Sequence, residues 1–118
     1  MRANSRIRQR LSRIILIGMT GLAATASTGV EISGTRQAAL LNLLKQDCGS
    51  CHGLTMKGGL GPALTPEALR GKPASMLREV VLRGRPGTPM PPWAPFLSES
   101  EAEWLIEVLL KGEINARR

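Results

Sequence analysis

The chain has 118 residues, a length that suits one domain, and its sixteen Lys and Arg against nine Asp and Glu give a formal charge of +7. Such a charge suggests an anionic partner, but nucleic acid is disfavoured because only three side chains are aromatic, too few for base-stacking platforms. A domain this small often needs a disulfide, a metal or a cofactor to be stable.

Residues 1–26 predict a cleavable secretory signal peptide. Five arginines, the last of them Arg13, precede an apolar run over residues 14–19, and Ala24-Thr25-Ala26 forms a small-x-small cleavage site. Removing this segment takes away five positive charges and lowers the net charge from +7 to +2. The apolar run is shorter than the roughly 20 residues of a membrane-spanning helix. We therefore expect a periplasmic protein without a stable membrane anchor, with an uncleaved anchor as the alternative.

The remaining chain predicts a flexible leader over residues 27–34 and a domain over residues 35–118. Apolar residues at helical spacing predict four short helices, near residues 35–45, 66–71, 73–84 and 98–112. The loops between them are rich in Gly and Pro, and no segment alternates as a strand would. The predicted fold class is therefore all-α, with long loops.

The first and last of these helices have the clearest signals. A stripe of leucines between residues 40 and 44 gives the first helix one apolar face, and Ser33 or Thr35 caps its start. Ser98 and Glu101 have the spacing of a capping box at the start of the last helix.

The strongest chemical signal is Cys48-Gly49-Ser50-Cys51-His52, at the end of the first helix. Positions i and i+3 lie on one face of a helical turn, so both thiols can add to the vinyl groups of one haem while the histidine turns toward the iron. We predict one haem c attached covalently through Cys48 and Cys51, with His52 as an iron ligand. A disulfide between the two cysteines is the main alternative. A thioredoxin-like pair would need a βαβ surround, and structural zinc would need a fourth ligand.

The second axial ligand of the iron must be a methionine, a weaker donor or water, because His52 is the only histidine. Met56 follows His52 too closely to reach the opposite haem face, and Met76 is expected to fill the core. Met90 lies between prolines, whose fixed backbone angles lower the entropy lost when a thioether is held in place. Met90 is therefore the predicted second iron ligand.

Over residues 35–112 the chain resembles the class I cytochromes c. The likeness lies in the haem motif, in Gly61-Pro62-Ala63-Leu64, in the Met90-Pro91 loop and in a last helix that contains Trp104. It implies four or so short helices wrapped round one haem, with the leucine stripe of the first helix packed against Trp104, Leu105 and Val108 of the last. It also implies that the backbone carbonyl of Pro62 bonds to the second ring nitrogen of His52 and fixes that ring.

The stretch GRPGTPMPPW over residues 84–93 is more specific. With the haem motif and its neighbours, it is similar to the small cytochrome c-55X type found with haem cd1 nitrite reductase in denitrifying bacteria. This likeness implies electron delivery to nitrite reductase, or a supporting part in making its haem d1. It also implies attachment of haem by the cytochrome c maturation machinery.

Together these features predict a one-electron carrier and not an enzyme, since no second acid–base pair, nucleophile or open metal site is evident. Cations prevail between residues 57 and 85 and acids between residues 99 and 113, a separation that would steer the haem edge toward an acidic redox partner. Arg83, Arg85 or Trp93 is a candidate to bond a haem propionate. The alternatives are an accessory haem protein in haem d1 maturation, a small-ligand sensor with an exchangeable iron position, and a colourless disulfide protein.

Overall fold

The computed structural model describes residues 31–115. The predicted signal peptide and residues 27–30 of the predicted leader lie outside this range. All regular structure between residues 31 and 115 is helical, which confirms the all-α class. The elements are α1 (Gly34–Leu43), η1 (Leu44–Cys48), α2 (Gly49–His52), α3 (Pro66–Leu69), α4 (Ala74–Arg83), α5 (Glu99–Lys111) and η2 (Glu113–Asn115).

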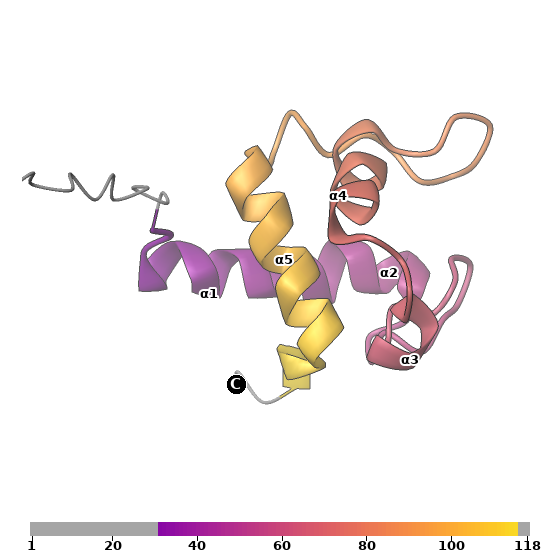
Figure 1. Ribbon diagram of the computed structural model, residues 1–118, viewed down its shortest axis with the longest axis horizontal. Coiled ribbons are helices and arrows are strands. Elements are labelled where there is room, and N and C mark those ends of the chain that lie inside the picture. The colour runs from indigo at the N-terminus through magenta and orange to yellow at the C-terminus, as the bar shows by residue number, and fades with distance from the viewer. Residues whose placement is uncertain (1–30, 116–118) are drawn as a thin grey trace, which may run out of the picture.

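The first three elements follow one another without a break and form one helical rod (Figure 1). Ser33, not Thr35, caps the rod: its hydroxyl oxygen accepts a hydrogen bond from the Arg36 backbone N–H at 3.4 Å. The segment η1 is a turn of π-helix, in which the backbone hydrogen bonds reach one residue further than in an α-helix. This turn leads directly into the two cysteines.

The short helices α3 and α4 begin close to where the sequence predicts them. Thr65 caps α3 by accepting a hydrogen bond from the Ala68 N–H at 3.3 Å, and Pro66 occupies the first turn, where a missing N–H costs little. Pro73 precedes α4, and Gly84 follows it with a φ of 68°, a conformation that ends the helix.

Helix α5 begins with the predicted capping box. The Ser98 hydroxyl oxygen accepts from the Glu101 N–H at 3.2 Å, and the Glu101 carboxylate accepts from the Ser98 N–H at 2.8 Å. Gly112 ends the helix in the left-handed conformation. None of the helices within residues 31–115 is long and apolar enough to cross a membrane.

The core lies where α5 crosses the rod (Figure 1). Leu40 and Leu44 of the rod belong to one buried cluster with Leu105 and Val108 of α5, as the leucine stripe predicts. Trp104 is only half-buried and packs at the edge of this cluster. The crossing fixes the end of the rod, and with it the two cysteines, relative to α5.

An ion pair joins the N-terminal ends of α1 and α5. The Arg36 Nε donates to the Glu101 carboxylate at 2.5 Å, and the same guanidinium donates to the Phe96 carbonyl oxygen at 3.4 Å. The hydrogen bond from Arg36, followed by that from the Ser98 N–H, lowers the pKa of Glu101 to about 2. The sequence contains no signal for this pair, because its partners are 65 residues apart.

Candidate functional site

A large cavity collects the five residues predicted to form the site: Cys48, Cys51, His52, Pro62 and Met90. Its volume is about 580 Å³, within the roughly 300–1,000 Å³ of cofactor sites. The end of the rod, the segment after it, α4, the Met90 loop and α5 all contribute walls, which are mainly aliphatic. The fold therefore leaves a large apolar space at the end of the rod.

The two cysteines lie on the last turns of the rod, and both thiols are free. Burial, with a smaller contribution from the charge of Asp47, raises the pKa of Cys48 to about 11. A thiol with this pKa remains protonated at neutral pH, so Cys48 lacks the thiolate that thioredoxin-like chemistry requires. Both cysteines line the cavity, so a group held there is within reach of the two thiols.

The imidazole of His52 is buried, with 8% exposure. Its Nδ1 lies 2.7 Å from the Pro62 carbonyl oxygen. A carbonyl can only accept, so this contact places the ring proton on Nδ1 and leaves the lone pair of Nε2 available to a metal ion. The contact also restrains rotation of the ring, as a hydrogen-bond partner of a metal-binding histidine does.

Met90 reaches the cavity from the loop that follows α4. The Met90 carbonyl accepts from the Arg85 N–H at 3.1 Å, and the Met90 N–H donates to the Thr88 hydroxyl at 3.3 Å. Further along, the Trp93 N–H donates to the Val81 carbonyl at 3.1 Å and ties the loop back to α4. The loop therefore presents Met90 from a backbone that is hydrogen-bonded on both sides.

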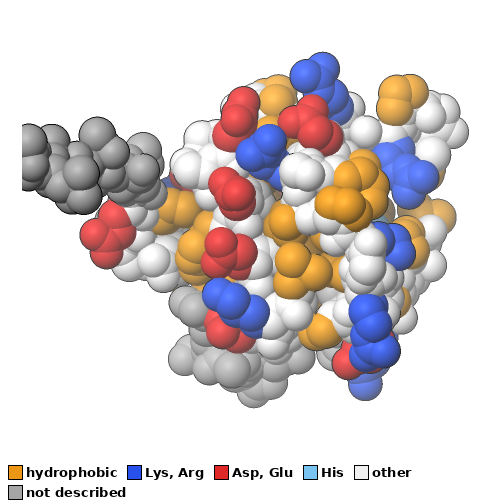
Figure 2. Space-filling model, in the orientation of Figure 1, with side chains coloured by type: hydrophobic (Ala, Val, Ile, Leu, Met, Phe, Trp, Pro, Cys, Tyr) orange, Lys and Arg blue, Asp and Glu red, His pale blue; other side chains and the backbone are white. Residues whose placement is uncertain are grey.

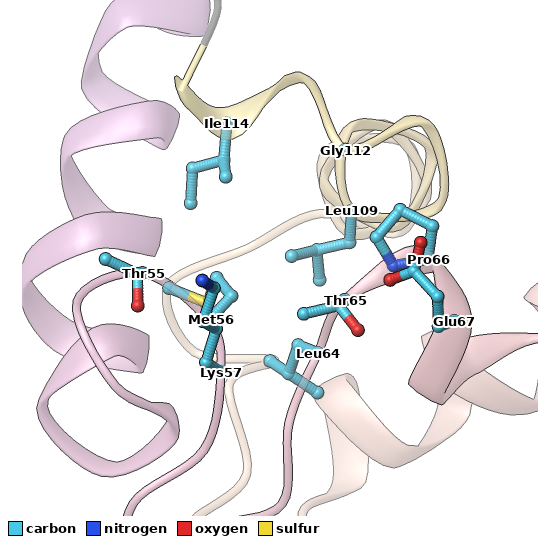
Figure 3. Close-up of a pocket in the computed structure, with 10 residues that line it drawn as sticks. All are labelled: Thr55, Met56, Lys57, Leu64, Thr65, Pro66, Glu67, Leu109, Gly112 and Ile114. Carbon is cyan, nitrogen blue, oxygen red and sulfur yellow. The ribbon is translucent and has the colours of Figure 1, made fainter.

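The other two methionines within residues 31–115 occupy different environments. Met56 is 2% exposed in the core, where it borders a smaller hollow with Leu109 and Ile114 (Figure 3). The expectation that Met76 fills the core is wrong, since this side chain is 42% exposed and lines the large cavity. The reason is that Met76 lies on the cavity side of α4, whereas Leu82 joins the buried cluster.

Charged side chains are separated over the described surface. Exposed acids spaced four residues apart run along α5, while most Lys and Arg gather over α3, α4 and the neighbouring loops (Figure 2). Of the cations between residues 57 and 85, Lys72 and Arg85 line the cavity. Arg83 does not, and its guanidinium instead bonds Glu79 at 2.7 Å.

Two glycines whose structural role the sequence does not reveal adjoin the site. A Cβ on Gly61 would lie 2.8 Å from two atoms of the His52 ring, and one on Gly84 would lie 2.6 Å from the Pro91 carbonyl carbon. Both positions require a residue without a side chain. Nothing local distinguishes them from the other glycines of these Gly-rich loops.

The donor set suits haem better than a lone metal ion. Two thiols on one helical face, an imidazole with an available Nε2 and a thioether meet in one apolar space. Within residues 31–115, no three His, Cys, Asp or Glu side chains converge closely enough to hold a metal ion by themselves. A structural zinc site therefore has no support in this part of the chain.

A family model described as "Cytochrome C oxidase, cbb3-type, subunit III" matches residues 36–107. Cytochrome c55X of Pseudomonas aeruginosa is 68% identical over 79 residues, which cover 67% of this chain and 66% of that protein. Cytochrome c55X of Stutzerimonas stutzeri is 49% identical over 110 residues, which cover 93% and 91% of the two chains.

The solved structure of the c-type cytochrome NirC is 64% identical, with a TM-score of 0.69, and the match covers 70% of this chain and 98% of that one. The dihydro-heme d1 dehydrogenase of Pseudomonas aeruginosa is 42% identical over 70 residues, which cover 59% of this chain and 14% of that enzyme. On these matches and the geometry of its cavity, the chain belongs to the c-type cytochromes, within the cytochrome c55X family.

Proposed function

We propose that this chain is a periplasmic carrier that moves one electron at a time through a single haem c. Membership of the c-type cytochromes implies covalent haem c. The observation that carries the proposal is the cavity, in which two thiols, a buried imidazole and a thioether surround one apolar space. Such a donor set would hold a haem through the two thiols, the imidazole and the thioether, and the haem would supply one-electron chemistry.

Each residue of the site has a separate task in this function. Cys48 and Cys51 hold the haem through thioether bonds, and His52 and Met90 bind the iron. The Pro62 carbonyl keeps the proton on Nδ1 and fixes the imidazole ring. Haem supplies the one-electron chemistry. Ligation by methionine would raise its reduction potential relative to harder donors.

The surface near the cavity favours an acidic redox partner. Lys72 and Arg85 are exposed and line the cavity, and so does Leu60, which is 75% exposed and offers an apolar contact beside them. A row of exposed acids, Glu99, Glu103 and Glu107, lies along α5 instead (Figure 2), and among residues 31–115 Asp47 is the one acidic residue that lines the cavity. This separation steers the basic side toward a negatively charged protein. Haem cd1 nitrite reductase is the proposed partner, on the likeness to cytochrome c55X of denitrifying bacteria.

The test is oxidation of the reduced holoprotein by haem cd1 nitrite reductase, followed by stopped-flow absorbance over a range of salt concentrations. The double variant Lys72→Glu, Arg85→Glu should slow association at low salt by about tenfold and flatten the salt dependence. The single reversal Lys111→Glu, at the end of α5 and outside the cavity lining, should change the rate little. Equal effects of the two variants contradict the docking surface, and absence of electron transfer contradicts the partner.

A second function, in haem d1 maturation, has one observation in its favour. The chain is similar to a segment of a dihydro-heme d1 dehydrogenase, an enzyme whose name implies that it releases electrons. In this role the chain would accept those electrons. Reduction of its haem on mixing with that dehydrogenase and its tetrapyrrole substrate would support this role. Rapid carbon monoxide binding by the unaltered reduced protein would instead favour a sensor.

A further inference from the structure

The loop that carries Met90 is closed by the Thr88 hydroxyl together with two backbone hydrogen bonds. The Thr88 Oγ1 donates to the Arg85 carbonyl oxygen at 2.7 Å and accepts from the Met90 N–H at 3.3 Å. The Thr88 N–H also donates to the Arg85 carbonyl at 3.0 Å, and the Arg85 N–H donates to the Met90 carbonyl at 3.1 Å. Both peptide groups that flank the Met90 Cα are therefore held from within the loop.

Gly84 allows the two ends of this loop to meet. It is buried, with φ 68° and ψ −168°, a backbone region that only glycine populates readily. A Cβ at this position would lie 2.6 Å from the Pro91 carbonyl carbon and 2.8 Å from the Met90 carbonyl oxygen. These are backbone atoms, so a side chain could be accommodated only by moving the segment that contains Met90.

We propose that Gly84 and Thr88 are positioning residues that hold Met90 against the iron and so decide how readily an outside ligand replaces it. This inference rests on the proposed function, because it takes Met90 as the second iron ligand. A loop that is already ordered loses little further entropy when its sulfur binds, which favours the closed state. Loosening the loop raises the fraction of molecules in which Met90 is detached from the iron, and the apparent affinity for an outside ligand rises in proportion. With the loop held closed by these two residues, the protein serves as an electron carrier. With the loop loosened, it would bind outside ligands at the iron.

The experiment titrates the oxidised holoprotein with imidazole and records the weak red band of sulfur–iron(III) coordination. Thr88→Val keeps the shape of the side chain but removes both hydroxyl hydrogen bonds, and should raise the apparent imidazole affinity about tenfold. Thr88→Ser keeps the hydroxyl and should stay close to the unaltered protein. Helical circular dichroism and covalently bound haem, measured in each variant, separate a displaced loop from failed folding.

Gly84→Ala should lose the red band while it keeps its haem. The control is Gly87→Ala, in the same loop, where φ is also positive at 76° but a Cβ would meet nothing within 4 Å. That variant should keep the band. If Gly84→Ala does not fold, the Thr88 variants decide the question.

Unchanged imidazole affinity in Thr88→Val, or an intact band in folded Gly84→Ala, overturns the inference for that residue. Equal loss of the band in Gly84→Ala and Gly87→Ala also overturns it for Gly84, since backbone strain alone then accounts for the effect. If the unaltered holoprotein lacks the band, ligation by Met90 fails and this inference falls with it. If the unaltered protein shows the band, an intact band in Gly84→Ala together with unchanged imidazole affinity in Thr88→Val contradicts the inference alone.

Discussion

The ion pair between Arg36 and Glu101 makes a prediction that can be worked out from the structure. Glu101→Gln keeps the length of the side chain and an oxygen that can accept from the Ser98 N–H, but it removes the charge. The native pKa of about 2, against the ordinary 4.5, is equivalent to about 3 kcal/mol at most. Because the Arg36 side chain is 43% exposed, water screens much of the pair. We therefore expect a loss of about 1–2 kcal/mol at neutral pH.

The sign of the pH dependence follows from the direction of the shift. The pKa of Glu101 is lowered by folding, so its contribution is fully present above the ordinary value of 4.5 and is lost as the pH falls through about 2. The difference in stability between the unaltered protein and Glu101→Gln should therefore shrink over this range. Contributions from other carboxylates cancel in that difference.

Urea and thermal unfolding of the holoprotein, followed by helical circular dichroism between pH 7 and pH 2.5, measure this difference, since urea carries no charge to screen the pair. At neutral pH the midpoint of thermal unfolding should fall by about 5–15 °C. The control is Glu107→Gln, since Glu107 pairs with Lys111 at 3.3 Å and both side chains are more than half exposed. That change should cost about 0.5 kcal/mol or less. A difference for Glu101→Gln that does not change with pH, or that equals the control, would refute the reasoning.

Further substitutions test the contacts around the cavity. Gly61→Ala places a methyl group 2.8 Å from the His52 ring. This change should destabilise the holoprotein by about 1–3 kcal/mol and alter its absorption spectrum. The control is Gly34→Ala, whose Cβ would meet nothing within 4 Å and which should leave the spectrum unchanged. Met56→Ala empties a buried position and should lower the free energy of unfolding by about 2–5 kcal/mol, whereas Met76→Ala should lower it by about 1 kcal/mol or less. The sulfur–iron band should persist in both variants. Loss of that band in either variant contradicts ligation by Met90.

The parts of the fold that short-range signals determine are predictable from the sequence. The capping box of Ser98 and Glu101 acts within a few residues, and this prediction agrees with the structure. The helices predicted near residues 66–71 and 73–84 are also present, as Pro66–Leu69 and Ala74–Arg83. The leucine stripe also gives the correct buried face, because helical spacing alone decides which residues share a side.

The parts that depend on tertiary contacts are not predictable in this way. Helical spacing places Met76 on an apolar face but cannot show that this face borders a cavity rather than α5. The π-helical turn η1 has no local signal, and the need for glycine at positions 61 and 84 depends on the approach of segments that lie elsewhere in the chain. The pairing of Arg36 with Glu101 depends on how α1 crosses α5.

The central claim is that Cys48 and Cys51 hold one haem whose iron is bound by His52 and Met90. The most direct measurement is the absorption spectrum of the exported holoprotein in both oxidation states, with acid extraction of a denatured sample in parallel. We expect haem that stays with the chain after extraction, and a weak red band in the oxidised protein that Met90→Ala abolishes. Covalent haem without that band contradicts the methionine ligand, and a colourless protein contradicts the haem site altogether.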